Sequence, residues 1–295
     1  MQDYIISCCS TADLTKQQLE KLNVNYICFH FELDGKQYYD DLGQSVSFSD
    51  FYNAMAQGKQ TKTSQVNCEE YEQYFRKLLK SGKDILHISF SSGLSGSYNS
   101  ARLAVDTMKQ EFPDRKIYLI DSLAASCGYG LLVDTASELR EKGYTIEENY
   151  RYIEENKLNL NHWFFSTDLS YYVKGGRISK TAGFIGQALN ICPLLDVNDA
   201  GKLIPREKIR TKKKVIKVIV DKMQQNAVDG INYNGKCFIS HSNCLQDAQE
   251  VASLIEERFK NLNGKVQINY VGTTIGSHTG PGTVALFFYG KKREN

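Results

Sequence analysis

One histidine and a few hydroxyl side chains are the residues of this chain best suited to ligand chemistry. His278 lies in a stretch that reads SHTGPG over residues 277–282, directly before the apolar run Thr283–Tyr289. The Gly-Pro-Gly sequence predicts a rigid, tight turn that lets a ligand come close to the backbone. An imidazole donates or accepts a hydrogen bond near neutral pH. By itself His278 is as consistent with a packed turn residue as with a functional one.

Two segments far upstream are rich in hydroxyl groups. Thr63 and Ser64 come just before a predicted helix N-cap at Asn67, and Ser91 and Ser92 end a predicted strand. Taken singly, each of these side chains is more often a cap or turn residue than a ligand contact. Their interest lies in their combination with His278.

A serine-dependent hydrolase or transferase is one hypothesis for this combination. Ser92 or Ser95 would be the nucleophile and His278 the base, with Asp13 or Asp121 as candidate orienting acids. The loop does not contain the Gly-x-Ser-x-Gly elbow of many hydrolases, because the residue two after Ser95 is a serine.

Other catalytic and metal motifs are not found in the sequence. Gly128 and Gly130 lack the third glycine of a dinucleotide fingerprint and lie in a helical pattern, so close helix packing is their predicted role. The eight cysteines include no Cys-x-x-Cys pair, and the five histidines do not cluster at metal-ligand spacing. We therefore expect reduced, buried thiols and no metal or other cofactor.

Composition and charge limit the class of protein further. The chain has 295 residues, of which 41% are hydrophobic, and a formal net charge of +2. No stretch is long and apolar enough to span a membrane and no signal peptide is visible, so we expect a cytoplasmic protein. The basic run from Arg206 to Lys217 raises a third hypothesis, a nucleic-acid module, but the near-neutral charge argues against it. A solvated face or a docking surface is the better interpretation.

The alternation of strand-like and helix-like segments predicts an α/β fold with two α/β domains. Residues 1–160 form an N-terminal Rossmann-like parallel sheet with helices on both faces, and residues 161–295 form a C-terminal mixed α/β sheet domain. The loop from Ser91 to Ser97 then lies at the carboxyl end of a strand and leads into a helix, where such sheets bind ligands.

Several local predictions can be checked against the structure. Thr15, Ser47, Asn67 and Thr145 are expected to be helix N-caps. A single strand is expected from Tyr26 to Phe31, a loop over residues 34–44, and a helix over residues 182–190.

Six short motifs, in order, make the chain resemble the DegV family over essentially its whole length. They are STADL (10–14), KTSQ (62–65), SSGLSGSY (91–98), KGGRIS (174–179), IPREKIR (204–210) and HTGPG (278–282). Each motif is weak alone, whereas the joint pattern is highly specific. The chain departs from the family at Cys8-Cys9, where Thr-Asp is usual, and at Cys192, where a basic residue is common.

The resemblance implies a lipid site between the two domains. A long-chain fatty acid such as palmitate, stearate or oleate would place its acyl chain in an apolar tunnel. The residues at the matching positions that would bind its carboxylate are Thr63, Ser64, Ser92, His278 and Thr279. Arg177 and Gly176 would lie near the carboxylate or a phosphate.

The resemblance also implies a partner. Family members act as the fatty-acid-binding subunit of bacterial fatty acid kinase, in which a separate kinase subunit uses ATP to convert the carboxyl group to an acyl phosphate. This chain would then be a carrier without chemistry of its own. Lys208 and Arg210, in the basic run, are the residues we expect to dock the kinase subunit.

Overall fold

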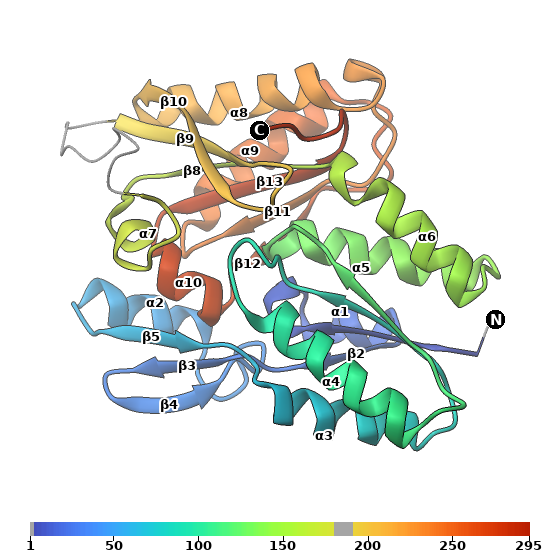
Figure 1. Cartoon of the computed structure of the whole chain (residues 1–295). Helices are drawn as coiled ribbons and strands as arrows, with labels where there is room; N and C mark the ends of the chain where they lie inside the picture. The colour runs from blue at the N-terminus through green and yellow to red at the C-terminus, as the bar shows by residue number, and fades with distance from the viewer. Residues whose placement is uncertain (1–2, 180–190) are drawn as a thin grey trace.

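The computed structural model describes residues 3–179 and 191–295, and within these residues the strands form three sheets (Figure 1). The first is a four-stranded sheet with the order β2-β1-β6-β7, in which every neighbouring pair is parallel. The parallel N-terminal sheet predicted from the sequence is therefore confirmed. Its strands are β1 (Ile5–Cys9), β2 (Val24–Ile27), β6 (Ile85–Ser89) and β7 (Ile117–Asp121).

Helices cover both faces of this sheet (Figure 1). The helix α4 packs on β6 and β7, with α3 beside it, while α5 packs on β1. Thr15, Asn67 and Thr145 each close a capping box, and Ser47 caps its helix, as predicted. The helices of this region are α1 (Lys16–Lys21), α3 (Cys68–Leu79), α4 (Ser97–Glu111), α5 (Ser126–Glu141) and α6 (Ile146–Asn156).

A small antiparallel sheet with the order β4-β3-β5 corrects two local predictions. The single strand expected over residues 26–31 is divided between β2 and β3, and the loop expected over residues 34–44 contains β4. Asp34 and Gly35 have φ values of 53° and 83°, which a two-residue hairpin turn requires. The elements are β3 (His30–Leu33), β4 (Lys36–Tyr39) and β5 (Thr61–Ser64), with α2 (Phe48–Ala56) in the connection between β4 and β5.

The C-terminal part of the chain forms a six-stranded mixed sheet with the order β10-β9-β8-β13-β11-β12. Only the β11–β12 pair is parallel among these described strands. The predicted helix over residues 182–190 lies outside the described residues. The strands are β8 (Leu160–Ser166), β9 (Ile191–Val197), β10 (Leu203–Arg210), β11 (Phe238–His241), β12 (Gln267–Tyr270) and β13 (Thr283–Tyr289).

The helix α5 is packed between the two large sheets. It contacts β1 of the parallel sheet and β8, β11 and β13 of the mixed sheet, while α8 (Lys212–Asn226) and α9 (Leu245–Arg258) also pack on the mixed sheet. A Cβ at Gly128 would lie 2.4 Å from His162 Nε2, and one at Gly130 would lie 2.6 Å from the Ala12 carbonyl oxygen. This confirms close packing as the role of the two glycines.

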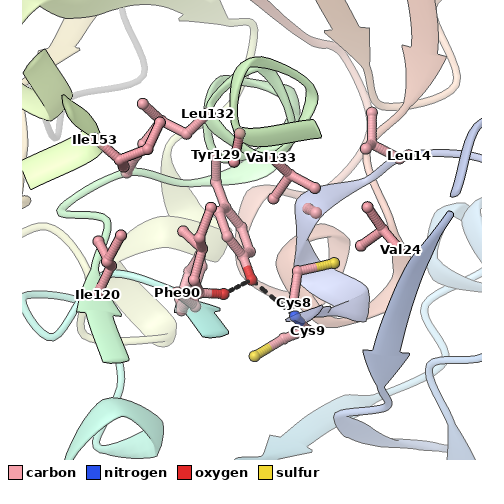
Figure 2. Packing of buried hydrophobic residues seen from close by; sticks show 14 of the residues in the cluster. Cys8, Cys9, Leu14, Val24, Phe90, Ile120, Tyr129, Leu132, Val133 and Ile153 are labelled. Atoms are coloured by element: carbon pink, nitrogen blue, oxygen red, sulfur yellow. Dashed lines mark hydrogen bonds between the residues drawn. The ribbon is translucent and has the colours of Figure 1, made fainter. Parts of the chain in front are cut away.

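The core of the parallel sheet contains polar atoms that are hydrogen-bonded inside it. The Tyr129 hydroxyl accepts a 2.7 Å hydrogen bond from the Cys9 backbone N–H (Figure 2) and donates one to the Ile88 carbonyl. All eight cysteines are free, and five of them are buried. Burial raises the pKa of the Cys8 and Cys9 thiols, so these two residues are uncharged packing groups.

Arg140→Met is expected to lower the free energy of unfolding by about 3 kcal/mol. Arg140 is 3% exposed, and its guanidinium donates to the carbonyl oxygens of Leu22 (2.7 Å), Asn23 (3.1 Å) and Tyr4 (3.4 Å). Methionine keeps much of the packing volume but removes these three hydrogen bonds, while the Leu22 carbonyl keeps a 2.9 Å hydrogen bond from Ser137 Oγ. Urea denaturation measures the loss, and Arg151→Met, on the exposed side of α6, is the matched control. A loss no larger than that of the control would contradict this role of Arg140.

Candidate functional site

A cavity of about 640 Å³ lies where the sheets meet. Residues of the small sheet and of the mixed sheet line it, including Thr63 on β5 and Ala285 on β13, together with residues that flank strands, including Phe29 just before β3 and Phe90 just after β6. Its wall is mainly apolar. The other large apolar residues of the wall are Leu94, Phe164, Tyr172, Val197, Leu203, Val271, Ile275 and Phe287.

The histidine motif is partly helical, which corrects the prediction of a simple turn. Residues Thr273–Thr279 form the helix α10, and His278 lies in its last turn. The predicted turn follows directly, with φ values of 65° at Gly280 and 88° at Gly282. Such positive values favour glycine. The helix holds the imidazole at one end of the cavity.

Three side chains from distant parts of the sequence meet at this end of the cavity. The Thr63 Oγ1 atom lies 2.7 Å from His278 Nε2, and Arg177 Nη1 lies 3.4 Å from His278 Nδ1. A guanidinium can only donate hydrogen bonds, so Nδ1 is the acceptor and Nε2 carries the proton. Nε2–H therefore donates to Thr63 Oγ1, which leaves the threonine proton available for a third group. We call Thr63, His278 and Arg177 the polar array.

The imidazole of the polar array is uncharged at neutral pH. Burial is the main cause that lowers the pKa of His278 to about 4, and the nearby Arg177 guanidinium contributes to this shift. Arg177 is half-buried and donates to the Gly175 carbonyl at 2.5 Å and to the Leu94 carbonyl at 3.2 Å. These two bonds fix the position of the guanidinium, which carries the positive charge of the array.

The predicted turn at residues 174–177 brings its backbone against the imidazole. It follows α7 (Ser170–Lys174), and a Cβ at Gly175 would lie 2.3 Å from His278 Nδ1. Gly176 has a φ of 71° and open space around its Cα. Gly176 does not line the main cavity; it lines a neighbouring hollow together with Arg177 and the start of β10.

The remaining residues predicted for a carboxylate site also lie at the cavity. Ser92 is exposed, and its backbone N–H donates to Asp121 Oδ1 at 3.1 Å. Ser64 is exposed as well, whereas Thr279 is buried and its hydroxyl is hydrogen-bonded to Ser242 Oγ at 3.2 Å. All three line the cavity, but of the residues predicted to bind the carboxylate, Thr63 and His278 are the ones in the polar array.

The arrangement required for a serine nucleophile is not assembled. His278 is hydrogen-bonded to Thr63 through Nε2 and faces Arg177 through Nδ1. The candidate acids are used elsewhere: Asp13 accepts from Ser126, and Asp121 accepts from the backbone of the Ser92 loop. In the described residues, no carboxylate is therefore hydrogen-bonded to this imidazole in the way a catalytic base needs.

A second hollow, of about 440 Å³, meets the cavity at the polar array. It shares Thr63, Arg177 and His278 with the main cavity, and it is otherwise mainly polar. Three lysines line it: Lys59, Lys62 and Lys174. The polar array can thus be approached from two sides, one apolar and one basic.

The predicted docking residues lie on the edge strand β10. Lys208 and Arg210 are exposed, and Ile209 between them is buried, so the two basic side chains share the outer face. Arg206, in the same basic run, is paired with Asp196 at 2.8 Å. Leu203, at the start of this strand, lines the cavity, and Lys208 and Arg210 lie five and seven residues further along β10.

Sequence reasoning did not identify the wall of the cavity or the support of α10. Phe29, Phe164 and Tyr172 line the cavity but have no distinguishing sequence signal. Asp40, which lies in the segment predicted to be a loop, accepts hydrogen bonds from the first turn of α10. The one sequence signal that this segment is ordered is the Asp34-Gly35 dipeptide, which is typical of a two-residue hairpin turn.

The described residues contain neither a metal-binding cluster nor a membrane-spanning helix. Residues 3–179 and 191–295 contain no group of three or more histidine, cysteine, aspartate or glutamate side chains able to hold a metal ion. Within the same ranges no helix has the length and hydropathy to cross a bilayer.

Fold and site together define an α/β protein with three sheets, whose mainly apolar cavity ends at a polar array. Residues 6–291 match the family described as uncharacterised protein, DegV family, and the chain belongs to this family. A DegV domain-containing protein of Clostridium perfringens is 38% identical over 295 residues, which is 100% of both chains. The family predicted from the six motifs is therefore confirmed.

Relatives with a described ligand share the whole fold. A protein of Thermotoga maritima described as fatty acid-binding is 30% identical over 281 residues, 94% of each chain. The crystal structure of a DegV lipid binding protein from the same organism has a TM-score of 0.85, with 28% identity and full coverage of both chains. A Thermus thermophilus DegV family protein, described by its fatty acid binding, has a TM-score of 0.86 and 26% identity, covering 99% of this chain and 100% of its own.

Proposed function

We propose that this chain binds one long-chain fatty acid, such as palmitate, stearate or oleate, and presents its carboxyl group to a separate ATP-dependent kinase subunit. The observation that carries the proposal is the polar array at the end of a mainly apolar cavity. The fatty acid binding described for the Thermotoga maritima and Thermus thermophilus relatives supports it. The cavity would lie between the two proposed domains, residues 1–160 and 161–295.

The polar array would orient the carboxylate rather than react with it. Thr63 receives a hydrogen bond from His278 and has its own proton available, so its hydroxyl can donate to a carboxylate oxygen. Ser92 offers a second hydroxyl, and Ser64 and Thr279 lie beside it. Arg177 supplies the positive charge for the carboxylate or for a developing phosphate.

The acyl chain would supply most of the binding free energy. Burying methylene groups contributes ~0.8 kcal/mol each, so a chain of about 16 carbons gives roughly 11 kcal/mol before the costs of association. The polar array therefore needs to provide orientation more than affinity. The two carboxylate oxygens are then held in a fixed place, which favours a reaction with an incoming group.

The second hollow supports presentation to a partner. The residues that it shares with the main cavity are those of the polar array, and its three lysines are not part of the main cavity, while Gly176 lines a neighbouring hollow with Arg177. A phosphoryl donor bound to the kinase subunit would reach the carboxylate from this basic side and form an acyl phosphate. In this role the chain is a cytoplasmic carrier that leaves the chemistry to its partner.

Identification of the co-purified lipid tests the proposal directly. The protein is purified, extracted with organic solvent, and the extract is analysed by mass spectrometry. We expect one saturated or monounsaturated fatty acid per chain. A protein that is always empty, and that does not bind added palmitate or oleate, would rule out the proposed function.

Reversal of the basic strand is expected to separate lipid binding from phosphorylation. In Lys208→Glu/Arg210→Glu, two exposed basic side chains become acidic, and docking to the kinase subunit should be strongly impaired because like charges would meet at the contact. Acyl phosphate formation should fall at least tenfold, whereas palmitate affinity should change less than about twofold. Loss of lipid binding instead would contradict the docking assignment.

Fatty acid affinity is expected to stay nearly constant from about pH 8 to about pH 5.5. The pKa of His278 is lowered to about 4, so the imidazole remains neutral over this range. A histidine with an ordinary pKa would become charged as the pH falls and would then bind a carboxylate more tightly. Equilibrium binding of a fluorescent fatty acid measures the profile. An increase at low pH that disappears in His278→Gln would contradict the neutral array.

A further inference from the structure

The helix α10 is supplied by the C-terminal half of the chain and is held by elements of both halves. It packs against α7 of its own half and against α2, β3 and β5 of the N-terminal half, and its His278 is hydrogen-bonded to Thr63 of β5. With seven residues, α10 is too short to be stable by itself in water. Contacts outside the helix must therefore decide where the imidazole lies.

Asp40 holds the first turn of α10. Its Oδ1 accepts a 2.9 Å hydrogen bond from Thr273 Oγ1, and its Oδ2 accepts a 3.3 Å hydrogen bond from the Thr274 backbone N–H. The first N–H groups of a helix have no partner inside the helix, and a carboxylate is favourable there. Asp40 is itself fixed, because it is 1% exposed and its backbone N–H donates to the Phe29 carbonyl at 2.8 Å.

A second carboxylate reaches the same point from another part of the chain. A Cβ at Gly272 would lie 2.6 Å from Asp13 Oδ1 and 3.6 Å from Asp40 Oδ1. Asp13 is in turn held by a hydrogen bond from Ser126 Oγ, and Asn269 Nδ2 donates to its backbone carbonyl at 3.0 Å. The residue before α10 thus sits between two buried carboxylates, with no space for a side chain of its own.

We do not expect the carboxylates of Asp13 and Asp40 to stabilise the fold. Burial is the main cause that raises the pKa of both Asp13 and Asp40, so the fold disfavours the charges that it encloses. Buried polar groups of this kind can instead determine which of several packed arrangements a chain adopts. Here the element that they locate is the helix that carries His278.

A displacement at the start of α10 would be transmitted to the imidazole. Thr273 and His278 are five residues apart, about 7.5 Å along one short helix. Between them, a Cβ at Gly276 would lie 2.5 Å from the Tyr52 hydroxyl oxygen, which donates to the Val271 carbonyl at 2.8 Å. The helix therefore packs closely against Tyr52, and a shift of its first turn displaces His278 as well.

We propose that Asp40 is a positioning residue, which sets His278 against Thr63 by holding the N-terminal end of α10, with Asp13 packed beside it against Gly272. The inference rests on the proposed function only in that the polar array is the carboxylate site. Neither aspartate lines the cavity, so Asp40 acts through the helix. Without Asp40 the imidazole would lose its contact with Thr63, and Ile275 of the same helix would shift in the cavity wall, whereas the wall residues outside α10 would remain.

Asp40→Asn tests the proposal in protein stripped of lipid. The titration of His278 is followed by NMR, with its resonance assigned by its absence in His278→Ala. Removing a negative charge alone would lower the pKa of His278 slightly. Release of α10 would expose the imidazole to water and raise the pKa by about one pH unit toward its ordinary value near 6.5. The two effects have opposite signs, so we expect a rise and, in the reloaded protein, a fall of about tenfold in palmitate affinity.

Asp41→Asn is the matched control, because the same change at the next residue alters a carboxylate that accepts hydrogen bonds from the backbone N–H groups of Gln44 and Ser45 and not from α10. It should leave the His278 titration unchanged. Thr273→Val removes the 2.9 Å bond to Asp40 without altering the carboxylate, and it should raise the His278 pKa in the same direction. Folded Asp40→Asn and Thr273→Val proteins with the wild-type titration would overturn the proposal. Because the titration needs no lipid, this outcome is distinct from a failure of fatty acid binding.

Discussion

Thr63→Val is expected to lower the affinity for palmitate about 30-fold, a loss of about 2 kcal/mol. The valine has nearly the shape of threonine, so the half-buried position stays filled. It removes the proposed donor to the carboxylate, and it leaves His278 Nε2–H without the acceptor that now lies 2.7 Å away. Isothermal titration of lipid-free protein measures the affinity, and thermal unfolding shows whether the fold is retained.

Thr61→Val is the matched control for this change. Thr61 lies two residues earlier on β5 and lines the basic hollow but not the main cavity, so its substitution should change palmitate affinity less than about twofold. Combining Thr63→Val with His278→Ala should cost less than the sum of the two single losses, because both residues act through one hydrogen bond. Additive losses would show that they bind the ligand independently.

Gly175→Ala is expected to lower palmitate affinity about 100-fold, and acyl phosphate formation with it. The added Cβ would lie 2.3 Å from His278 Nδ1 and 3.2 Å from the Tyr171 carbonyl. The imidazole or the turn must therefore move by about 1 Å, which breaks the alignment of His278 with Thr63 and Arg177. The backbone at Gly175 is ordinary for alanine, with φ −75° and ψ −8°, so the effect comes from the contact alone.

Gly176→Ala adds the same methyl group at the next residue, where the backbone conformation is unfavourable and the methyl group meets no neighbour. No atom lies within 4 Å of a Cβ there, but the φ of 71° is unfavourable for alanine. We expect a loss of about 1 kcal/mol in the free energy of unfolding and little change in palmitate affinity. Equal effects of the two substitutions on affinity would show that disruption of the turn, rather than the contact with His278, is responsible.

The parts of the fold that were predicted well are those with a local cause. Thr15, Asn67 and Thr145 cap helices because each is followed three residues later by a glutamine or glutamate that closes the capping box. The parallel sheet followed from strands separated by helices, and it is present as predicted. Local periodicity and capping need no information from the rest of the chain.

The errors occurred where tertiary contacts decide the structure. The segment at residues 273–279 contains one glycine and three threonines, so its helix propensity is low, and it is helical because Asp40 and the N-terminal elements hold it. The short strands β3 and β4 likewise depend on pairing with each other and with β5. Propensity gives little guidance when the stabilising partner is more than 200 residues away.

For the candidate site, the sequence by itself determined the residue types: a histidine before a Gly-Pro-Gly turn, hydroxyls after a strand, and an arginine after two glycines. Their order along the chain was enough to identify the family. Only the tertiary structure decided that Thr63 contacts His278 Nε2 and that Arg177 contacts His278 Nδ1. It also decided that the imidazole is neutral and that an apolar cavity ends at it. Distances, burial and desolvation arise between segments that are far apart in sequence, so they exist only once the chain is folded.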